Sequence, residues 1–457
     1  MGAEYTILGV LLFSLFGYFS GKGKAAQSVN GDISQLRSQP SYHGFYVVLL
    51  VIIPATILIF LWYLLEGFVI REAVLSSLLP EDIKQSKDLT YGIILAIAEG
   101  IKAPSDPIAP VAEAATYHNV LKERSIQILI ICASVFSLGA FLYSWKNIKA
   151  DFVARERVEV IIRYVLGFAS LIAILTTIGI ILSLLFEALR FFNLVPVSEF
   201  FFSTEWSPQI AIREDQVGSS GRFGILPLLT GTLLVTFVAM IIAGPIGLMS
   251  AVYMSEYAAP KFRTTVKPLL EILAGIPTVV YGFFAAITVG PFVRRLGESI
   301  GLELSSESAL VAGGVMGIMI IPFVSSLSDD VMNAVPNDLR DGSYALGATK
   351  SETIKQVVIP AALPGIISSF LLGISRAIGE TMIVVMAAGL AANLTVNPLE
   401  SVTTITVQIV TLLVGDQEFD SAKTLAAFAL GLFLFAVTLI LNIAALQVVK
   451  KYREQYD

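Results

Sequence analysis

The sequence has few of the residues that build metal sites and disulfides. Its 457 residues include one cysteine and two histidines. A single cysteine forms neither an intramolecular disulfide nor a thiolate cluster, and Cys132 lies in an apolar run typical of a core position. The histidines, His43 and His118, belong to no group with metal-ligand spacing. The sequence therefore predicts no metal site.

Nucleotide-binding and catalytic motifs are missing as well. The chain contains no Walker A pattern, G-x-x-x-x-G-K-[S/T], and no Rossmann fingerprint. No nucleophile is paired with a general base. We therefore expect a protein that is not an enzyme, needs no cofactor and does not itself hydrolyse ATP.

Charged residues are also few. Only 14% of the residues are charged, whereas 55% are hydrophobic and the mean hydropathy is +0.79. A soluble domain has about 25% charged residues. This chain cannot cover a soluble surface, so its surroundings are expected to be membrane lipid. The net charge of −6, without a basic stripe, argues against nucleic-acid binding.

Long apolar stretches are what the sequence has instead. About nine are long enough to cross a bilayer as helices. The N-terminus lacks the basic segment and cleavage site of a signal peptide, so the first stretch is expected to be retained. The chain is thus predicted to be an all-α, polytopic membrane bundle. The stretches lie near 3–20, 44–66, 125–145, 158–189, 225–255, 264–290, 308–328, 364–390 and 424–447.

Lysine and arginine collect in alternate loops, which indicates the orientation. Cytoplasmic loops are enriched in these residues. The C-terminus is therefore predicted to be cytoplasmic, and an odd number of spans places the N-terminus outside. The richer loops are 146–163, 261–267, 340–355 and the tail 450–453.

The motifs divide the chain into two parts. Residues 1–149 hold three spans and an extracytoplasmic segment, 67–124, with no recognisable motif. Residues 150–457 hold six spans and every informative motif. The join is predicted to be either an interfacial helix or a plain span end with positive flanks.

The cytoplasmic loop 340–366 has the most specific pattern. It contains D-G-S-Y-A-L-G-A-T from Asp341 to Thr349. Small residues let a short helix lie close to another subunit, and a glycine can end it. A second helix is expected from about Ser351 to just before Pro360. Such a helix–turn–helix can transmit a rigid-body push; the alternative is an ordinary surface loop.

This loop resembles the EAA loop of ATP-binding-cassette (ABC) importers, whose glycine and Leu-Pro spacing it keeps. The triplet itself differs in all three letters. The resemblance implies contact with a separate ATPase. The corresponding coupling residues are Asp341, Gly342 and Ser343 for the triplet, Gly347, Ala348 and Thr349 at the turn, and Ile359 with Pro360 for Leu-Pro.

Further blocks extend the resemblance over roughly residues 150–450. Together they resemble the phosphate importer permease, the PstC-type subunit, with a type I permease core of six spans. The 1–149 extension departs from the short form of that family. The blocks are F-F-S-T-E-W-S-P (201–208), L-L-E-I-L-A-G-I-P-T-V-V-Y-G-F-F (269–284), G-I-M-I-I-P-F-V-S-S-L-S-D-D-V (317–331) and L-G-I-S-R-A-I-G-E-T-M (372–382).

The resemblance implies one half of the translocation channel of an ATP-driven phosphate importer in a bacterial inner membrane. It implies three partners: a PstA-type second permease, a PstB-type cytoplasmic ATPase and an extracytoplasmic phosphate-binding protein. A secondary transporter and a membrane-bound phosphate sensor are the competing hypotheses. Sulfate, molybdate and phosphonate are alternative substrates.

Two charged residues lie inside the eighth predicted span. A rise of about 1.5 Å per residue places Arg376 roughly 18 Å beyond Pro364, near the bilayer midplane. A lone arginine there is costly, so it is expected to avoid lipid and to pair with Glu380 one turn on. Its guanidinium can exchange a carboxylate for a phosphate oxyanion. We predict both as substrate-pathway residues; a purely structural pair is the alternative.

Two prolines also fall inside predicted spans. Pro277 and Pro322 are each expected to remove a backbone hydrogen bond and bend a helix. Bent helices suit a gate, although proline is common in membrane helices for other reasons.

Overall fold

The computed structural model describes residues 2–77, 87–100, 109–210, 220–302, 305–414 and 421–453. These residues are almost entirely helical, and nine of their helices are long and apolar enough to cross a membrane. The predicted all-α, polytopic architecture is confirmed. The chain divides into two compact units, Met1–Leu175 and Thr176–Asp457, with the division inside one long helix. The predicted boundary after residue 149 stays a prediction.

The first unit is a set of long helices. At 38 and 39 residues, α2 and α4 exceed the ~20 residues that span a bilayer, so each extends beyond it. Their extended ends pack with α3 around Ile70, Val74 and Ile94. The described part of the 67–124 segment is therefore helical. The elements are α1 (Gly2–Gln27), η1 (Ile33–Gln35), α2 (Pro40–Ser77), α3 (Lys87–Ala98), α4 (Ala109–Asn147) and the start of α5 (Ala154–Leu194).

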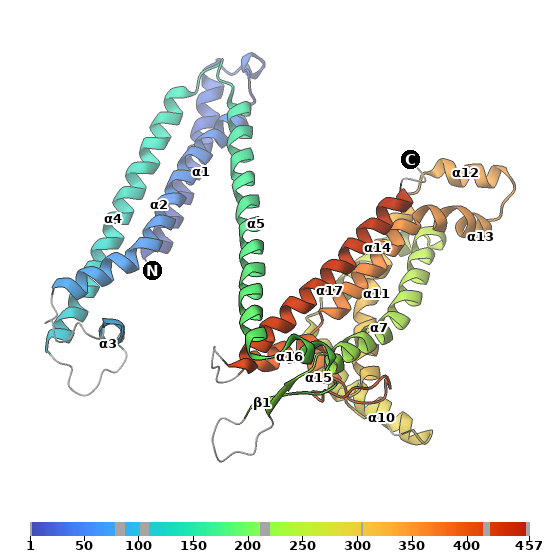
Figure 1. Ribbon diagram of the computed structural model, residues 1–457. Helices are drawn as coiled ribbons and strands as arrows, with labels where there is room; N and C mark the ends of the chain where they lie inside the picture. The colour runs from blue at the N-terminus through green and yellow to red at the C-terminus, as the bar shows by residue number, and fades with distance from the viewer. Residues whose placement is uncertain are drawn as a thin grey trace. The chain divides into compact units, whose positions relative to one another are not determined.

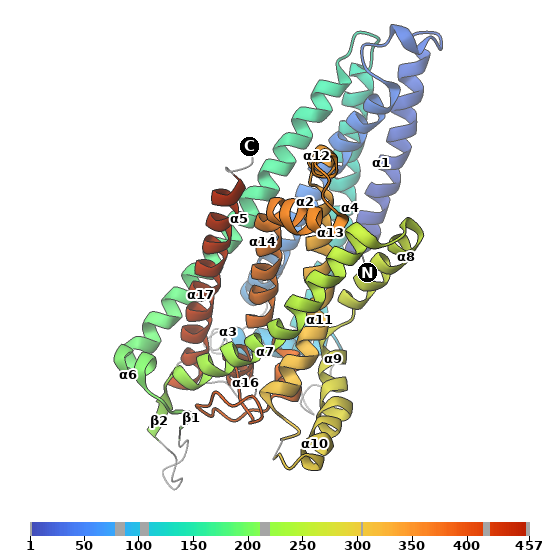
Figure 2. The same ribbon diagram turned by 90° about the vertical axis from the view of Figure 1, so that its right-hand side faces the viewer.

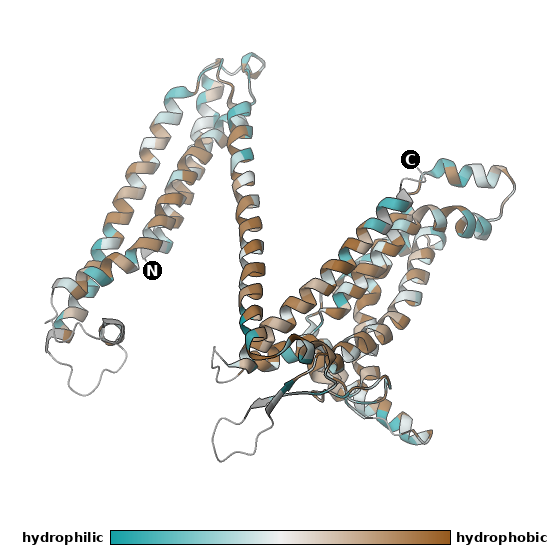
Figure 3. Ribbon diagram, in the orientation of Figure 1, coloured by the Kyte–Doolittle hydropathy of each residue, from teal (hydrophilic) through white to brown (hydrophobic). Residues whose placement is uncertain are grey.

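The helix α5 runs without interruption for 41 residues. Figure 3 shows hydrophobic residues along most of it. No separate helix precedes α5 among the described residues 148–153, and at 41 residues α5 is longer than a bilayer requires, so both alternatives for the join stay predictions.

The second unit holds the remaining helices and, among the described residues, one antiparallel hairpin with Trp206 opposite Phe223. Figure 1 places α12 and the end of α17 at one end of this unit, and α10 and β1 at the other. The elements are α6 (Val197–Phe202), β1 (Trp206–Ile210), β2 (Ser220–Phe223), α7 (Leu226–Val252), η3 (Tyr253–Tyr257), α8 (Pro260–Ala274), α9 (Thr278–Phe284), η4 (Ala285–Val289), α10 (Gly290–Ser299), α11 (Ala309–Asn333), α12 (Asn337–Ala345), α13 (Lys350–Thr353), η5 (Ile354–Val358), α14 (Ile359–Ile378), α15 (Met382–Ala387), α16 (Ile405–Leu413) and α17 (Ala422–Arg453).

The core of the second unit is the close pair α7 and α11, seen together in Figure 2. Glycines bring the two backbones together. A Cβ at Gly313 would lie 2.7 Å from Cβ of Val238, and one at Gly247 would lie 2.8 Å from Cβ of Val324. Real Cβ atoms do not approach so closely, so larger residues at these glycines would push the helices apart. We infer that α7 and α11 move as one body.

The sixth predicted span, 264–290, is wrong in its limits. The helix α8 ends at Ala274, and Pro277 precedes a new helix that begins at Thr278. The apolar window long enough to span is Thr278–Ser299. Hydropathy alone could not show this break, because residues on both sides of it are apolar.

Candidate functional site

Arg376 lies in the last turn of α14, and its side chain is exposed in this chain. Its guanidinium carbon stands 4.2 Å from the centre of the Phe323 ring on α11. This is cation–π geometry, in which the ring face attracts the cation. Among the described residues, no hydrogen bond or ion pair to the Arg376 side chain is found. The N–H edge of its guanidinium is therefore open to a ligand.

Glu380 does not pair with Arg376, contrary to the prediction. The helix α14 ends at Ile378 with Gly379 as its cap, so the i, i+4 spacing no longer places the two side chains on one face. The Glu380 carboxylate instead accepts the backbone N–H groups of Met382 at 3.0 Å and Ile383 at 3.4 Å. Only 9% of Glu380 is exposed. It caps the start of α15.

An irregular segment, 388–404, follows α15 and packs against the same region. Non-helical backbone is tolerated in a membrane protein where protein or a water-filled cavity surrounds it. Its carbonyls are satisfied at the N-terminus of α11: Ala309 donates to Glu400 at 3.1 Å and Leu310 donates to Pro398 at 2.8 Å. The Thr406 hydroxyl donates to the carbonyl of Glu380 at 2.9 Å. These contacts fix the chain just beyond Glu380.

The sequence reasoning missed two partners of this region. In the sequence, nothing distinguishes Phe323 from the other apolar residues beside Pro322. Gln408 was also missed: it is buried and accepts the indole N–H of Trp206 at 2.9 Å. Its sequence signal was a glutamine in a largely apolar stretch, 405–413.

The two predicted bends have different outcomes. Pro322 lies inside α11 and is buried, so its position is as predicted and the bend itself stays a prediction. Pro277 does not bend a helix, because it stands at the break before α9. Its fixed φ and missing N–H suit the start of a helix. A gating role for either proline stays a prediction.

The predicted coupling loop forms two helices joined by a tight turn. The triplet Asp341, Gly342 and Ser343 lies on α12, which projects at the end of the unit (Figure 1). Gly347 has φ +86, a conformation that favours glycine, so it reverses the chain. Thr349 then caps α13 in a reciprocal capping box with Glu352.

The second helix of the loop does not end before Pro360. It continues through the π-turn η5 into α14, and Lys350–Ile378 forms one span. The wider π-turn η5 directly precedes Pro360 and leaves room for the proline ring inside the continuous helix. Ile359 and Pro360 therefore lie within a rigid continuation from the loop into the bundle.

Apolar side chains are exposed around the turn. Leu346 is 91% exposed, beside the smaller Ala348, while Leu339 and Tyr344 on α12 are also exposed. Figure 3 shows that α12 itself is mostly hydrophilic, so these side chains stand in a polar setting. An apolar tip with a polar rim is typical of a protein-docking surface.

Comparisons with known proteins match both parts of the chain. Residues 243–454 match the family of binding-protein-dependent transport system inner membrane components. Residues 7–176 match a family described as phosphate ATP-binding cassette transporter. The second match covers most of the extension, in which the motifs showed no resemblance.

Individual relatives align with this chain over most of their own length. A probable ABC transporter permease protein, YqgH, of Bacillus subtilis is 34% identical over 63% of this chain and 89% of the relative. The phosphate transport system permease protein PstC 1 of Mycobacterium tuberculosis is 32% identical over 64% of this chain and 92% of the relative. A crystal structure of a bacterial alginate-importing ABC transporter aligns at 15% identity with a TM-score of 0.44, covering 65% of this chain and 99% of that one.

Proposed function

Because the chain belongs to the PstC-type family of ABC-transporter permeases, we propose that it forms half of the membrane channel of an ATP-driven phosphate importer. The observation that carries this proposal is the identity to phosphate permeases over nearly their whole length. A second permease, a cytoplasmic ATPase and an extracytoplasmic phosphate receptor complete the importer. The C-terminus and α12 then face the cytoplasm.

The loop geometry supports a docking role at α12. Leu346 at its tip is exposed, and the span continues directly from the loop. A force applied at the turn is thereby carried into α14 without a flexible joint.

Arg376 supports the choice of an anionic substrate. Stacking on Phe323 uses the face of the guanidinium and leaves its edge available for two parallel N–H bonds to an oxyanion. An exposed arginine in a membrane-spanning helix favours a polar pathway over lipid. Glu380 supports the pathway by fixing the backbone beyond Arg376.

Uptake into proteoliposomes tests the function. The chain, the second permease, the ATPase and the receptor are reconstituted, and labelled phosphate is measured with and without ATP. Uptake that requires ATP and every component is expected. ATP-independent uptake would identify a secondary transporter, and receptor-dependent signalling without uptake would identify a sensor. Competition by sulfate, molybdate or phosphonate decides the substrate.

Crosslinking tests the docking surface. Leu346→Cys, in a Cys132→Ser background, is expected to crosslink to the ATPase. The control is Leu302→Cys, which is 45% exposed and follows α10 at the other end of the unit. Crosslinking of the ATPase from position 302, and not from position 346, would refute docking at α12.

A further inference from the structure

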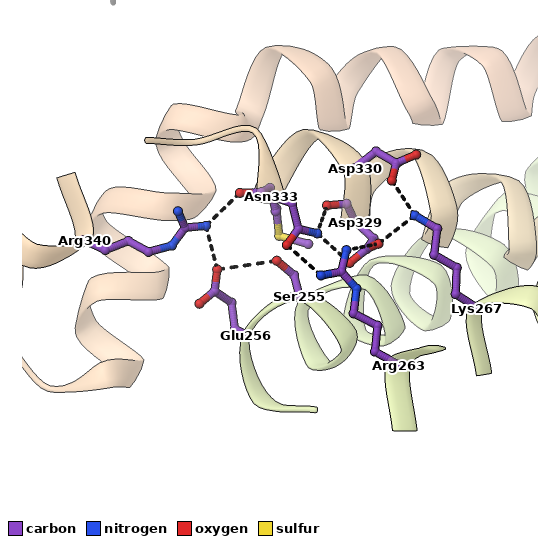
Figure 4. Close-up of polar contacts among 9 residues, drawn as sticks. Ser255, Glu256, Arg263, Lys267, Asp329, Asp330, Asn333 and Arg340 are labelled. Carbon is purple, nitrogen blue, oxygen red and sulfur yellow. Dashed lines mark hydrogen bonds and ion pairs between the residues drawn. The ribbon is translucent and has the colours of Figure 1, made fainter. Parts of the chain in front are cut away.

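Arg340 joins α12 to the end of α11 (Figure 4). Its guanidinium donates to the carbonyl oxygens of Met332 at 2.8 Å and Val335 at 2.6 Å. The last carbonyls of a helix have no partner within it, and a cation complements their partial negative charge. Arg340 therefore caps α11 from the neighbouring helix.

The same guanidinium also reaches α7. It donates to Oε1 of Glu256 at 3.0 Å, and Glu256 lies in the π-turn η3 that ends α7. Both side chains are largely buried, with exposed fractions of 13% for Arg340 and 7% for Glu256. A buried pair adds little net stability compared with an apolar pair, but it fixes a specific geometry. The pair ties α12 to the ends of both core helices.

A separate charge cluster holds α8 to α11, beside the first in Figure 4. The buried carboxylate of Asp329 accepts N–H groups of Arg263 at 2.9 Å and Lys267 at 3.1 Å. Burial lowers the pKa of Lys267, but its bonds to Asp330 and Asp329 outweigh this and raise the pKa above its ordinary value. Lys267 is thus charged at neutral pH. This cluster does not involve α12, so it can be tested separately from the Arg340 link.

We propose that the Arg340–Glu256 pair transmits movement of α12 to the α7–α11 body, and so couples ATP hydrolysis to opening of the channel. The inference rests on the proposed importer function. Two connections would then leave the docking surface: the continuous helix into α14 and this ion pair into α7 and α11. Because α7 and α11 are locked together by close glycine contacts, a displacement at Glu256 moves both.

The test measures phosphate imported per ATP hydrolysed in proteoliposomes. Glu256→Ala leaves the largely buried Arg340 guanidinium without its carboxylate, so Arg340 is expected to turn to solvent and to release the α11 carbonyls as well. We expect ATP hydrolysis to continue while the transport ratio falls about tenfold. Glu256→Gln keeps a hydrogen-bond acceptor without the charge, so it is expected to recover part of the ratio. Arg294→Gln is the control, because it breaks the exposed Arg294–Glu298 pair near the other end of the unit.

Three results separate the possibilities. An unchanged ratio in Glu256→Ala would overturn the link. Uptake and ATP hydrolysis that fall in parallel with the amount of assembled complex, without rescue by Glu256→Gln, would show a purely structural pair and also overturn it. A wild-type complex without ATP-driven phosphate uptake would refute the importer function instead. Spin labels at Leu346 and Met249 add a second readout: their distance distribution should broaden in Glu256→Ala and stay narrow in Arg294→Gln.

Discussion

The Arg376 guanidinium lies against the face of an aromatic ring and is not paired with a carboxylate, which affects how it could bind an anion. A carboxylate partner would occupy the N–H donors that bind an oxyanion, so phosphate would have to displace it. The Phe323 ring stabilises the charge from its face and leaves the donors available. If Arg376 lines the substrate pathway, as we propose, an arriving anion would gain bidentate hydrogen bonds without breaking an ion pair. The attraction of the ring is modest, so it does not compete with the anion.

Substitution of Arg376 is the direct test at this scale. Arg376→Gln is expected to abolish phosphate uptake in assembled complexes, because it removes both the positive charge and the two parallel N–H donors of the guanidinium. Arg376→Lys keeps the charge as a point donor and is expected to retain a small part of the uptake. Uptake is measured against the amount of complex recovered. Normal uptake by Arg376→Gln would remove this residue from the pathway.

Glu380 should respond differently to its two simplest substitutions. Glu380→Gln keeps an oxygen that can accept the Met382 N–H, so α15 and the assembly should survive. Glu380→Ala removes this cap, which is expected to cost about 0.5–2 kcal/mol of stability. Melting temperatures of the purified complexes compare the two. Equal destabilisation by both would show that the charge, and not the capping bond, matters.

At the scale of elements, the sequence predicted the helices and missed how prolines divide them. The turn at Gly347 and the short helix α12 were predicted from small residues and glycine. Proline rules suggested that the loop helix ends before Pro360 and that Pro277 bends a span. The π-turn before Pro360 and the break before Pro277 depend on packing with neighbouring helices. The prediction that Arg376 pairs with Glu380 was wrong for the same reason, because α14 ends at Ile378, between the two residues.

The turn after α12 offers a matched pair of glycines. Both Gly347 and Gly342 have open space where a Cβ would stand, so backbone conformation alone distinguishes them. Gly347 has φ +86, and an alanine there costs roughly 1–2 kcal/mol. Gly342 is helical, and an alanine there stabilises by about 0.5–1 kcal/mol.

We therefore expect Gly347→Ala to lower the phosphate imported per ATP, because it displaces the exposed Leu346 side chain at the turn. Gly342→Ala should leave this ratio unchanged. Proteoliposome transport and ATP hydrolysis are measured on both variants. A larger loss in Gly342→Ala would mean that the ATPase contacts the α12 surface closely at that point, and that the turn conformation is secondary.

At the scale of the whole molecule, the chain combines two units that match separate families. The second unit contains its own core, α12, Arg376 and the charge clusters. Because the ABC-importer motifs lie wholly beyond residue 149, we predict that the extension has a role outside the channel, with the 67–124 segment as a contact surface for another protein or for regulation.

Deletion of residues 1–149 tests this separation. The helix α5 begins at Ala154, so the cut leaves it whole, and its most apolar window has none of its residues buried within the chain. Lipid can cover that surface. Removing three spans reverses the side of the N-terminus, and the basic residues Arg155, Arg157 and Arg163 then favour a cytoplasmic start. The truncated chain should assemble with its partners and import phosphate. A truncated chain that inserts and assembles normally but imports nothing would show that the extension belongs to the channel.

If the truncated chain fails to insert, residues 1–149 are coexpressed as a separate chain. Restored uptake would then show that the extension acts as an assembly factor.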